Sequence, residues 1–123
     1  MKKKAKACCA SQNGCYVLSC SGACDLGSIS DHVARKLSRE GYRKMHCLAI
    51  VAAGVEKSIQ QLKKSNLLVI DGCNQECGKK IVESAGFGDF YYLRITDLGF
   101  EKDKTGISGN TINSVFKIAS RLN

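Results

Sequence analysis

Apolar runs and segments of helical periodicity alternate along this sequence from about residue 15 to its end. The apolar runs end in polar or glycine-containing turns, and they predict buried strands over residues 15–20, 42–49, 67–73 and 90–96. Apolar residues at helical spacing predict helices over residues 29–37, 55–62, 75–85 and 110–122. The chain therefore consists of successive strand–helix units.

Strands that alternate with helices predict a parallel sheet, because parallel neighbours need a crossover connection and a helix normally supplies it. We expect a small doubly wound α/β fold of the Rossmann or flavodoxin-like type, with about four strands and helices on both faces. Such sheets bind ligands outside the carboxyl ends of their strands, near the point where the winding direction reverses. The strand orders 2-1-3-4 and 3-2-1-4 both place the first three strands side by side.

The length and composition of the chain limit the number of domains and the location of the protein. The 123 residues, 44% of them hydrophobic, suffice for one α/β domain over residues 15–123, preceded by a flexible leader of lysines and cysteines over residues 1–14. No apolar run is long enough to cross a membrane, and the lysines at the start are not followed by the apolar core of a signal peptide. We therefore expect a cytoplasmic protein that does not associate with membranes.

The net charge of +8 indicates solubility before it indicates a partner. Lysines and arginines are spread along the chain and often stand beside carboxylates, as in Arg39-Glu40. Nucleic-acid binding needs clustered basic residues with exposed aromatics between them, whereas the aromatic cluster Phe90-Tyr91-Tyr92 lies in a predicted strand. We expect no nucleic-acid partner, and the sequence identifies no protein partner.

The eight cysteines carry the clearest chemical signal. In a chain without an export signal, such a number favours metal binding or redox chemistry over disulfides. Cys20, Cys47 and Cys73 are 27 and 26 residues apart, about the length of one strand–helix unit, so each is expected at the carboxyl end of its strand. Cys77 follows Cys73 by one turn of a helix that Asn74 is expected to cap.

These cysteines fit the dimensions of a metal site. Neighbouring strands lie about 4.8 Å apart, and metal–sulfur bonds of about 2.3 Å place the sulfurs of a tetrahedral site slightly less than about 4 Å apart. Three adjacent strand ends and the first turn of the third helix can supply this geometry. Zinc suits tetrahedral sulfur ligation best, and an iron–sulfur cluster is the competing cofactor that spacing alone does not exclude.

The same cysteines also fit two other interpretations. Buried thiols can pack as small hydrophobic side chains, although four of them at one sheet edge favour a metal. A thiol–disulfide redox enzyme would use Cys73 with Cys77, or Cys20 with Cys24, as attacking and resolving thiols.

The absence of two sequence motifs disfavours two kinds of enzyme. Phosphatases and arsenate reductases of this fold need an arginine six residues after the nucleophile, where this chain has Leu26 after Cys20 and Lys79 after Cys73. The loop over residues 20–27 occupies the position of a dinucleotide phosphate loop, but it lacks the three-glycine fingerprint. A binding protein is therefore favoured over an enzyme.

The residues around the cysteines resemble a known family. Four motifs occur in the order typical of the DGC-domain family, over about residues 20–102: Cys20-Ser21-Gly22, Cys47-Leu48-Ala49, Asp71-Gly72-Cys73 with Cys77, and Thr96-Asp97-Leu98-Gly99. Members of this family are identified as zinc-binding by four chelating cysteines, and their biological role is unknown. The resemblance implies that Cys20, Cys47, Cys73 and Cys77 are zinc ligands. Metal handling or sensing is compatible with such a site.

The chain departs from the family pattern in its additional thiols. Cys24 stands where the family more usually has a small residue that binds no metal. Its spacing from Cys20 repeats that of Cys77 from Cys73, which makes Cys24 a fifth candidate ligand. Further thiols outside the pattern are Cys8, Cys9 and Cys15.

Polar residues beside the cysteines have less specific expected roles. Asp71 and Asp97 are expected to accept hydrogen bonds from turn N–H groups, and the competing role is to orient metal ligands from outside. His46 precedes Cys47 and therefore faces the opposite side of a strand, so we expect a surface or core histidine and not a ligand.

Overall fold

A computed structural model describes residues 14–122 as a four-stranded, all-parallel sheet covered by helices. The strands are β1 (Cys15–Ser19), β2 (Lys44–Met45), β3 (Asn66–Asp71) and β4 (Tyr91–Arg94). They lie in the order β2-β1-β3-β4, and every adjacent pair is parallel. The expected small α/β fold is confirmed, and of the two expected strand orders the structure has 2-1-3-4.

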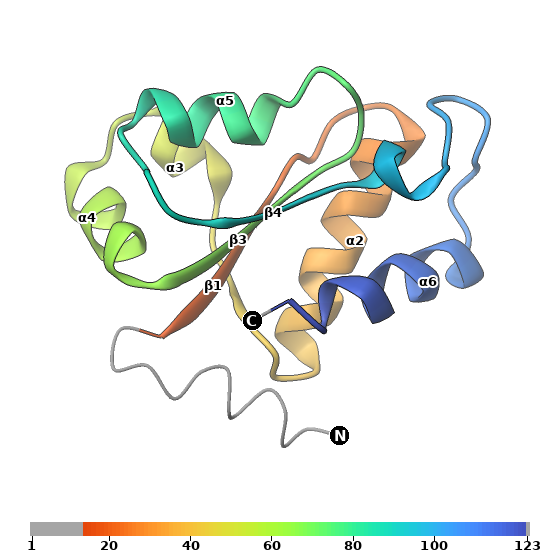
Figure 1. Cartoon of the computed structure of the whole chain (residues 1–123), viewed down its shortest axis with the longest axis horizontal. Coiled ribbons are helices and arrows are strands. Elements are labelled where there is room, and N and C mark those ends of the chain that lie inside the picture. Colours follow the sequence, from red (N-terminus) through yellow and green to blue (C-terminus); the bar gives the residue numbers. More distant parts are fainter. Residues whose placement is uncertain (1–13, 123) are drawn as a thin grey trace.

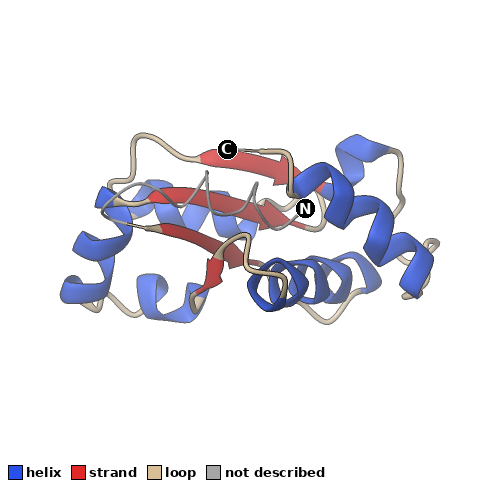
Figure 2. Ribbon diagram, turned by 90° about the horizontal axis from the view of Figure 1, so that it is seen from below, coloured by secondary structure: helices blue, strands red, loops and turns tan. Residues whose placement is uncertain are grey.

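Helices cover both faces of this sheet, as Figures 1 and 2 show. Helices α2 (Asp25–Arg39) and α6 (Gly109–Ala119) pack on one face, and α3 (Leu48–Ala52), α4 (Glu56–Lys64) and α5 (Cys77–Ser84) pack on the other. A short 3-10 helix, η1 (Ile95–Leu98), follows β4. The helices that follow β1 and β3 lie on opposite faces, so the winding direction reverses between the two central strands. Folds of this kind bind ligands at the carboxyl edge beside that reversal.

The two central strands supply side chains to two cores, one on each face. Val17 of β1 and Leu68 of β3 pack against α2 and α6, whereas Leu18 and Val69 pack against the helices of the other face. Successive residues of a strand point to opposite faces, so a strand covered on both sides has a continuous apolar sequence. For this reason the apolar runs predicted β1 and β3 to within two residues at each end.

The second strand is shorter than the predicted strand over residues 42–49. Only the two residues of β2 pair with β1, and the apolar residues that follow form α3. Leu48, which belongs to the predicted strand, is instead the first residue of α3 and packs against the core of that face. Before β2, the buried Arg43 side chain donates to the carbonyl oxygens of Tyr16 and Asn66 and joins the amino ends of β1 and β3.

The other elements exist with shifted ends. The first helix is longer than the predicted 29–37, because it already begins at Asp25. The helix predicted over residues 75–85 begins at Cys77, because Glu76 has a left-handed backbone conformation with a φ of 53°. The strand predicted over residues 90–96 ends at Arg94, where the chain enters η1.

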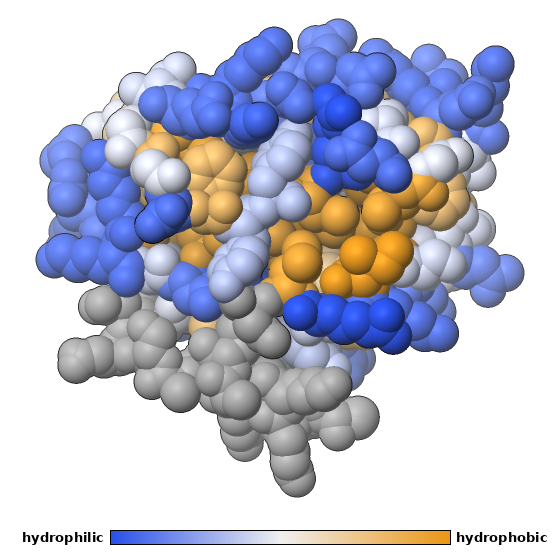
Figure 3. Space-filling view, viewed as in Figure 1, coloured by the Kyte–Doolittle hydropathy of each residue, from blue (hydrophilic) through white to orange (hydrophobic). Residues whose placement is uncertain are grey.

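Apolar side chains gather across the middle of the face shown in Figure 3, over β4, η1 and α6, with hydrophilic residues around them. Tyr91 of β4 and Ile118 of α6 are exposed apolar side chains of these elements. β4 is the last strand of the sheet on this side, so its outer edge is unpaired within residues 14–122.

Residues 1–13 and 123 are not described. The expected leader, with Cys8 and Cys9, therefore lies almost wholly outside the described residues. Within residues 14–122, no helix has the length and the apolar character that crossing a membrane requires.

Candidate functional site

Three strands that lie side by side each deliver one cysteine to the carboxyl edge of the sheet. Cys20 directly follows β1, Cys47 is the N-cap of α3 just after β2, and Cys73 lies two residues after β3. Cys77 is the first residue of α5, at the same edge. This edge is also where the winding direction reverses, which is the usual position of a ligand site in a doubly wound sheet.

The turn after β1 holds the Cys20 thiol against the backbone. The N–H of Gly22 donates a hydrogen bond to the Cys20 sulfur. A Cβ atom at position 27 would lie 2.8 Å from the Gly22 nitrogen, so glycine at this position lets the first turn of α2 approach the turn closely. Cys24 is the N-cap of α2, makes no capping hydrogen bond through its side chain, and packs against the apolar core.

Asp71 fixes the start of α5. Its buried carboxylate accepts hydrogen bonds from the N–H of Gly78 at 2.8 Å, the N–H of Lys79 at 3.0 Å and the hydroxyl of Tyr92 at 2.8 Å. N–H groups in the first turn of a helix have no partner within the helix, and here a residue from the preceding strand supplies it. Asp71 thus accepts backbone N–H groups, which is the favoured expectation, and it positions the turn that carries Cys77.

Gly72 brings the end of β3 against α2. A Cβ atom at this position would lie 2.6 Å from the carbonyl carbon of Leu26 and 2.8 Å from the nitrogen of Gly27. A residue with a side chain does not fit at position 72 between these backbones. The close approach places Cys73 next to the first turn of α2, where Cys73 and Cys24 pack against the same core. The Asp71-Gly72-Cys73 motif therefore combines a helix cap, a backbone contact and a thiol.

The loop after Cys73 differs from its prediction. Asn74 does not cap α5; its side-chain oxygen accepts a hydrogen bond from the hydroxyl of Thr96 at 3.1 Å. The N-cap is Glu76, whose carboxylate forms a 2.7 Å ion pair with Arg94. Arg94 also pairs with Asp97 at 2.8 Å, so Asp97 accepts from a side chain and not from the turn N–H groups expected of it. These pairs join the loop to η1, and nothing in the sequence spacing indicated them.

Cys20 has an environment that disfavours its thiolate. Burial raises the pKa of the Cys20 thiol, and the nearby Asp71, Cys77 and Cys73 raise it further, against the opposing hydrogen bond from Gly22. The influence of both other cysteines shows that Cys20, Cys73 and Cys77 lie in one neighbourhood.

Cys47 has different surroundings. Its side chain is exposed, and its N–H donates a 2.9 Å hydrogen bond to Nδ1 of His46. The His46 ring packs edge-on against Tyr16 with a centroid distance of 5.9 Å. His46 thus has the packing role expected of it.

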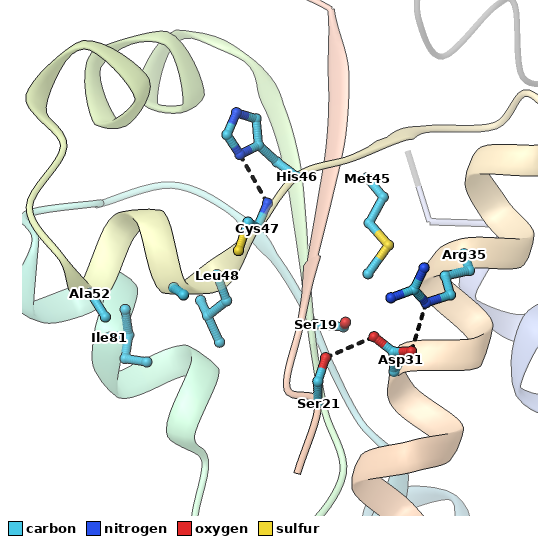
Figure 4. A pocket seen from close by; sticks show the side chains of 11 residues that line it. Ser19, Ser21, Asp31, Arg35, Met45, His46, Cys47, Leu48, Ala52 and Ile81 are labelled. Carbon is cyan, nitrogen blue, oxygen red and sulfur yellow. Dashed lines mark hydrogen bonds and ion pairs between the residues drawn. The ribbon is translucent and has the colours of Figure 1, made fainter.

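A cavity of about 630 Å³ lies beside Cys47 at the carboxyl end of β1, and Figure 4 shows its lining. The Asp31–Arg35 ion pair of α2 forms at 2.7 Å and lines this cavity. Ser19, the last residue of β1, also lines it. No sequence pattern indicated the cavity, because its lining residues come from distant segments.

The cysteines do not form a preassembled metal site. Within residues 14–122, no group of three or more His, Cys, Asp or Glu side chains is arranged to hold a metal ion. The thiols of Cys20, Cys24, Cys47, Cys73 and Cys77 are not bridged by disulfides. Metal ligation by the four predicted cysteines therefore remains a prediction.

Comparison with known proteins agrees with the motifs. A family model described as a DGC domain matches residues 16–119, which is most of the chain. No curated protein and no solved structure matches the chain.

Proposed function

The chain belongs to the DGC-domain family, and from this premise we propose that it is a zinc-binding protein whose ligands are Cys20, Cys47, Cys73 and Cys77. The strand order is the observation that supports the proposal most directly. β2, β1 and β3 are neighbours, and a cysteine follows each of them at the same edge of the sheet. Cys77 adds a fourth thiol from the first turn of α5.

The donor set fits zinc by its chemistry. Thiolate sulfur is a preferred zinc ligand, and four thiolates complete a closed tetrahedral site. Asp71 places negative charge beside Cys20, and a divalent cation there would be favoured by it. Since the raised pKa of Cys20 favours its protonated form, zinc binding should release a proton from it.

Zinc binding would draw the four thiols together from their present positions. Cys47 and Cys77 are exposed, so their side chains have room to turn toward a shared ion. Asp71 would hold the first turn of α5 in place during this step, and Gly72 would hold Cys73 against α2. These two residues act as positioning residues for the ligands that follow them.

A site of this kind favours a binding protein over an enzyme. Four thiolates on one zinc ion leave no coordination position for water or a substrate. Handling or sensing of a metal in the cytoplasm, where thiols stay reduced, is the role that fits such a site.

A thiol–disulfide redox enzyme is the second candidate. Cys77 is exposed at the start of a helix and follows Cys73 by four positions, which suits an attacking and a resolving thiol. The raised pKa of Cys20 opposes this candidate for that cysteine, because only the thiolate is nucleophilic.

Metal content tests the proposal. Full-length protein purified anaerobically without chelator should contain about one zinc ion per chain by elemental analysis and should show no visible absorption. Iron and labile sulfide with a visible spectrum would instead indicate an iron–sulfur cluster. A folded, colourless protein that contains no metal and does not take up added zinc would contradict the proposal.

Single serine variants test the ligand set. Changes of Cys20, Cys47, Cys73 or Cys77 to serine should each strongly weaken zinc binding, and changes of Cys8 or Cys9 should leave it unchanged. Cys24→Ser separates this quartet from one that contains Cys24. Because Cys24 is not one of the proposed ligands, this variant should keep its zinc. It should also be at least as stable as the unmodified protein, since serine is a better N-cap than cysteine. Loss of zinc in Cys24→Ser, with zinc retained in Cys47→Ser, would show that Cys24 and not Cys47 is the fourth ligand.

A further inference from the structure

The cavity at the carboxyl end of β1 has the size and the walls of a small-molecule site. It lies between α2 on one side and α3 with α5 on the other, as Figure 4 shows. Its volume of about 630 Å³ falls within the range of roughly 300–1,000 Å³ that is usual for ligand pockets. Its apolar wall consists of Met45, Leu48, Ala49, Ala52 and Ile81.

A buried hydroxyl in the lining lacks a hydrogen-bond partner. Ser19 is 4% exposed, and its Oγ is the buried side-chain polar atom within residues 14–122 for which the structure provides no partner. An unpaired buried hydroxyl destabilises the folded state, so such groups are uncommon in folded proteins. Ser30 is equally buried, but its hydroxyl donates to the carbonyl oxygen of Ile70 at 3.0 Å. Ser19 is therefore the buried serine of the lining whose hydroxyl lacks a hydrogen-bond partner.

The charged lining of the cavity consists of the Asp31–Arg35 ion pair. Each oxygen of Asp31 already accepts a hydrogen bond, Oδ1 from the hydroxyl of Ser21 at 2.8 Å and Oδ2 from Nε of Arg35 at 2.7 Å. Arg35 uses only Nε in this pair, and no described residue accepts from its two terminal nitrogens. A guanidinium that is held in place with its terminal N–H groups unused is suited to bind a carboxylate.

We propose that this cavity binds a small organic carboxylate with an apolar body. The carboxylate would accept hydrogen bonds from Ser19 and from the terminal nitrogens of Arg35, and the apolar body would lie against Leu48, Ala52 and Ile81. The net charge of +8 favours the approach of an anion. This site goes beyond the zinc proposal and does not depend on it, although Cys47 lines the same cavity.

Three small molecules distinguish the contribution of the ligand's charge from that of its apolar body. The full-length protein is titrated with 4-phenylbutanoate, with its neutral amide and with acetate, and binding is followed by calorimetry and by backbone amide chemical shifts. The carboxylate should bind at least about tenfold more tightly than the amide, because hydrogen bonds to charged groups are the stronger ones. Acetate lacks the apolar body and should bind weakly. Shift changes should centre on residues 19, 35, 48 and 52.

Single substitutions test which side chains contact the bound carboxylate. Ser19→Ala should weaken 4-phenylbutanoate binding about tenfold, and it should leave the unliganded protein as stable as before or more stable, because it removes an unpaired hydroxyl. Arg35→Gln should abolish the preference for the carboxylate over the amide. Arg39→Gln removes the same charge one turn along α2, outside the cavity, and should change nothing. Ala52→Phe should block the cavity and prevent binding of every probe.

The titrations are run on zinc-loaded and on chelated protein, so that loss of zinc and loss of the carboxylate site are distinguished. The proposal is supported if Ser19→Ala binds 4-phenylbutanoate more weakly and Arg35→Gln loses the preference for the carboxylate over the amide, while the zinc content stays constant. The proposal is overturned if no probe shifts the cavity residues, if the amide binds as tightly as the carboxylate, or if Ser19→Ala binds 4-phenylbutanoate as well as the unmodified protein.

Discussion

Asp71 is the residue on which the candidate site depends most, although it is not a predicted ligand. One buried carboxylate accepts two backbone N–H groups of α5 and the Tyr92 hydroxyl. It thereby fixes the helix that carries Cys77 to the strand that leads to Cys73. These hydrogen bonds give the aspartate of the Asp71-Gly72-Cys73 motif a structural role.

Asp71→Asn should lower the free energy of unfolding by about 2–4 kcal/mol, because the amide group presents a donor to a backbone N–H and removes a charge-assisted bond. Urea denaturation measures this change. Tyr92→Phe removes one of the three hydrogen bonds and should cost only about 1 kcal/mol. Equal costs for the two variants would show that the helix cap is not the main contribution of Asp71.

At the scale of elements, the site depends on how closely β3 and α2 approach each other. The Gly72 position lies directly against the backbone of Leu26 and Gly27. Elements this close cannot be separated without moving Cys73 relative to Cys20. The geometry of the cysteines is thus set by the packing of two elements from different parts of the chain.

Gly72→Ala should therefore destabilise the fold by more than about 2 kcal/mol, since the added methyl group meets backbone and not a movable side chain. It should also weaken zinc binding. The control is Gly109→Ala, where an added Cβ meets nothing within 4 Å and α6 gains a better helix former. Thermal unfolding and zinc titration measure both effects, and a stable, zinc-binding Gly72→Ala would show that the close approach is dispensable.

The connection between η1 and α6 is held by a carboxylate of α2. Asp25 accepts hydrogen bonds from the N–H groups of Asp103 at 2.8 Å, Thr105 at 3.0 Å and Gly106 at 3.2 Å. The bond from Asp103 is the main cause that lowers the pKa of Asp25 below its ordinary value of 3.8. A carboxyl whose pKa is lower in the folded state stabilises it above the unfolded value and loses this contribution as the pH falls through the folded pKa.

Amide protection in residues 103–106 should accordingly decrease as the pH falls below about 3.8, after correction for intrinsic exchange rates. Asp25→Asn should show low protection already at neutral pH, with no further acid-dependent loss. Glu101→Gln removes a charge from the same connection and should keep the acid transition. Hydrogen exchange followed by NMR measures all three, and a transition that persists in Asp25→Asn would assign it to another group.

At the scale of the whole molecule, the fold was accessible from the sequence because both faces of β1 and β3 are buried. Continuous apolar runs and intervening helical periodicity sufficed to predict a parallel sheet and to limit the strand order to two alternatives. The sequence failed where an apolar run changes from strand to helix, as at α3, because residues such as Val51 are buried in either conformation. It also misplaced the start of α5, since capping by Asp71 is a long-range contact that spacing does not reveal.

The candidate site could be predicted from the sequence only in part. The regular spacing of Cys20, Cys47 and Cys73 predicted their places at strand ends, because one strand–helix unit has a characteristic length. The unpaired hydroxyl of Ser19 and the cavity around it were not visible in the sequence, since the lining comes from β1, α2, α3 and α5. Local pattern thus specifies the elements, whereas the chemistry between them depends on packing.

The most direct test of the zinc proposal is timed alkylation of the protein as isolated, followed by peptide mapping, before and after chelation. Zinc-bound thiolates are shielded from alkylation, so Cys20, Cys47, Cys73 and Cys77 should react slowly before chelation and quickly after it, while Cys24 reacts at the same rate in both states. Rapid labelling of Cys73 or Cys77 before chelation, with a reversible disulfide between them, would contradict zinc binding and favour the redox enzyme.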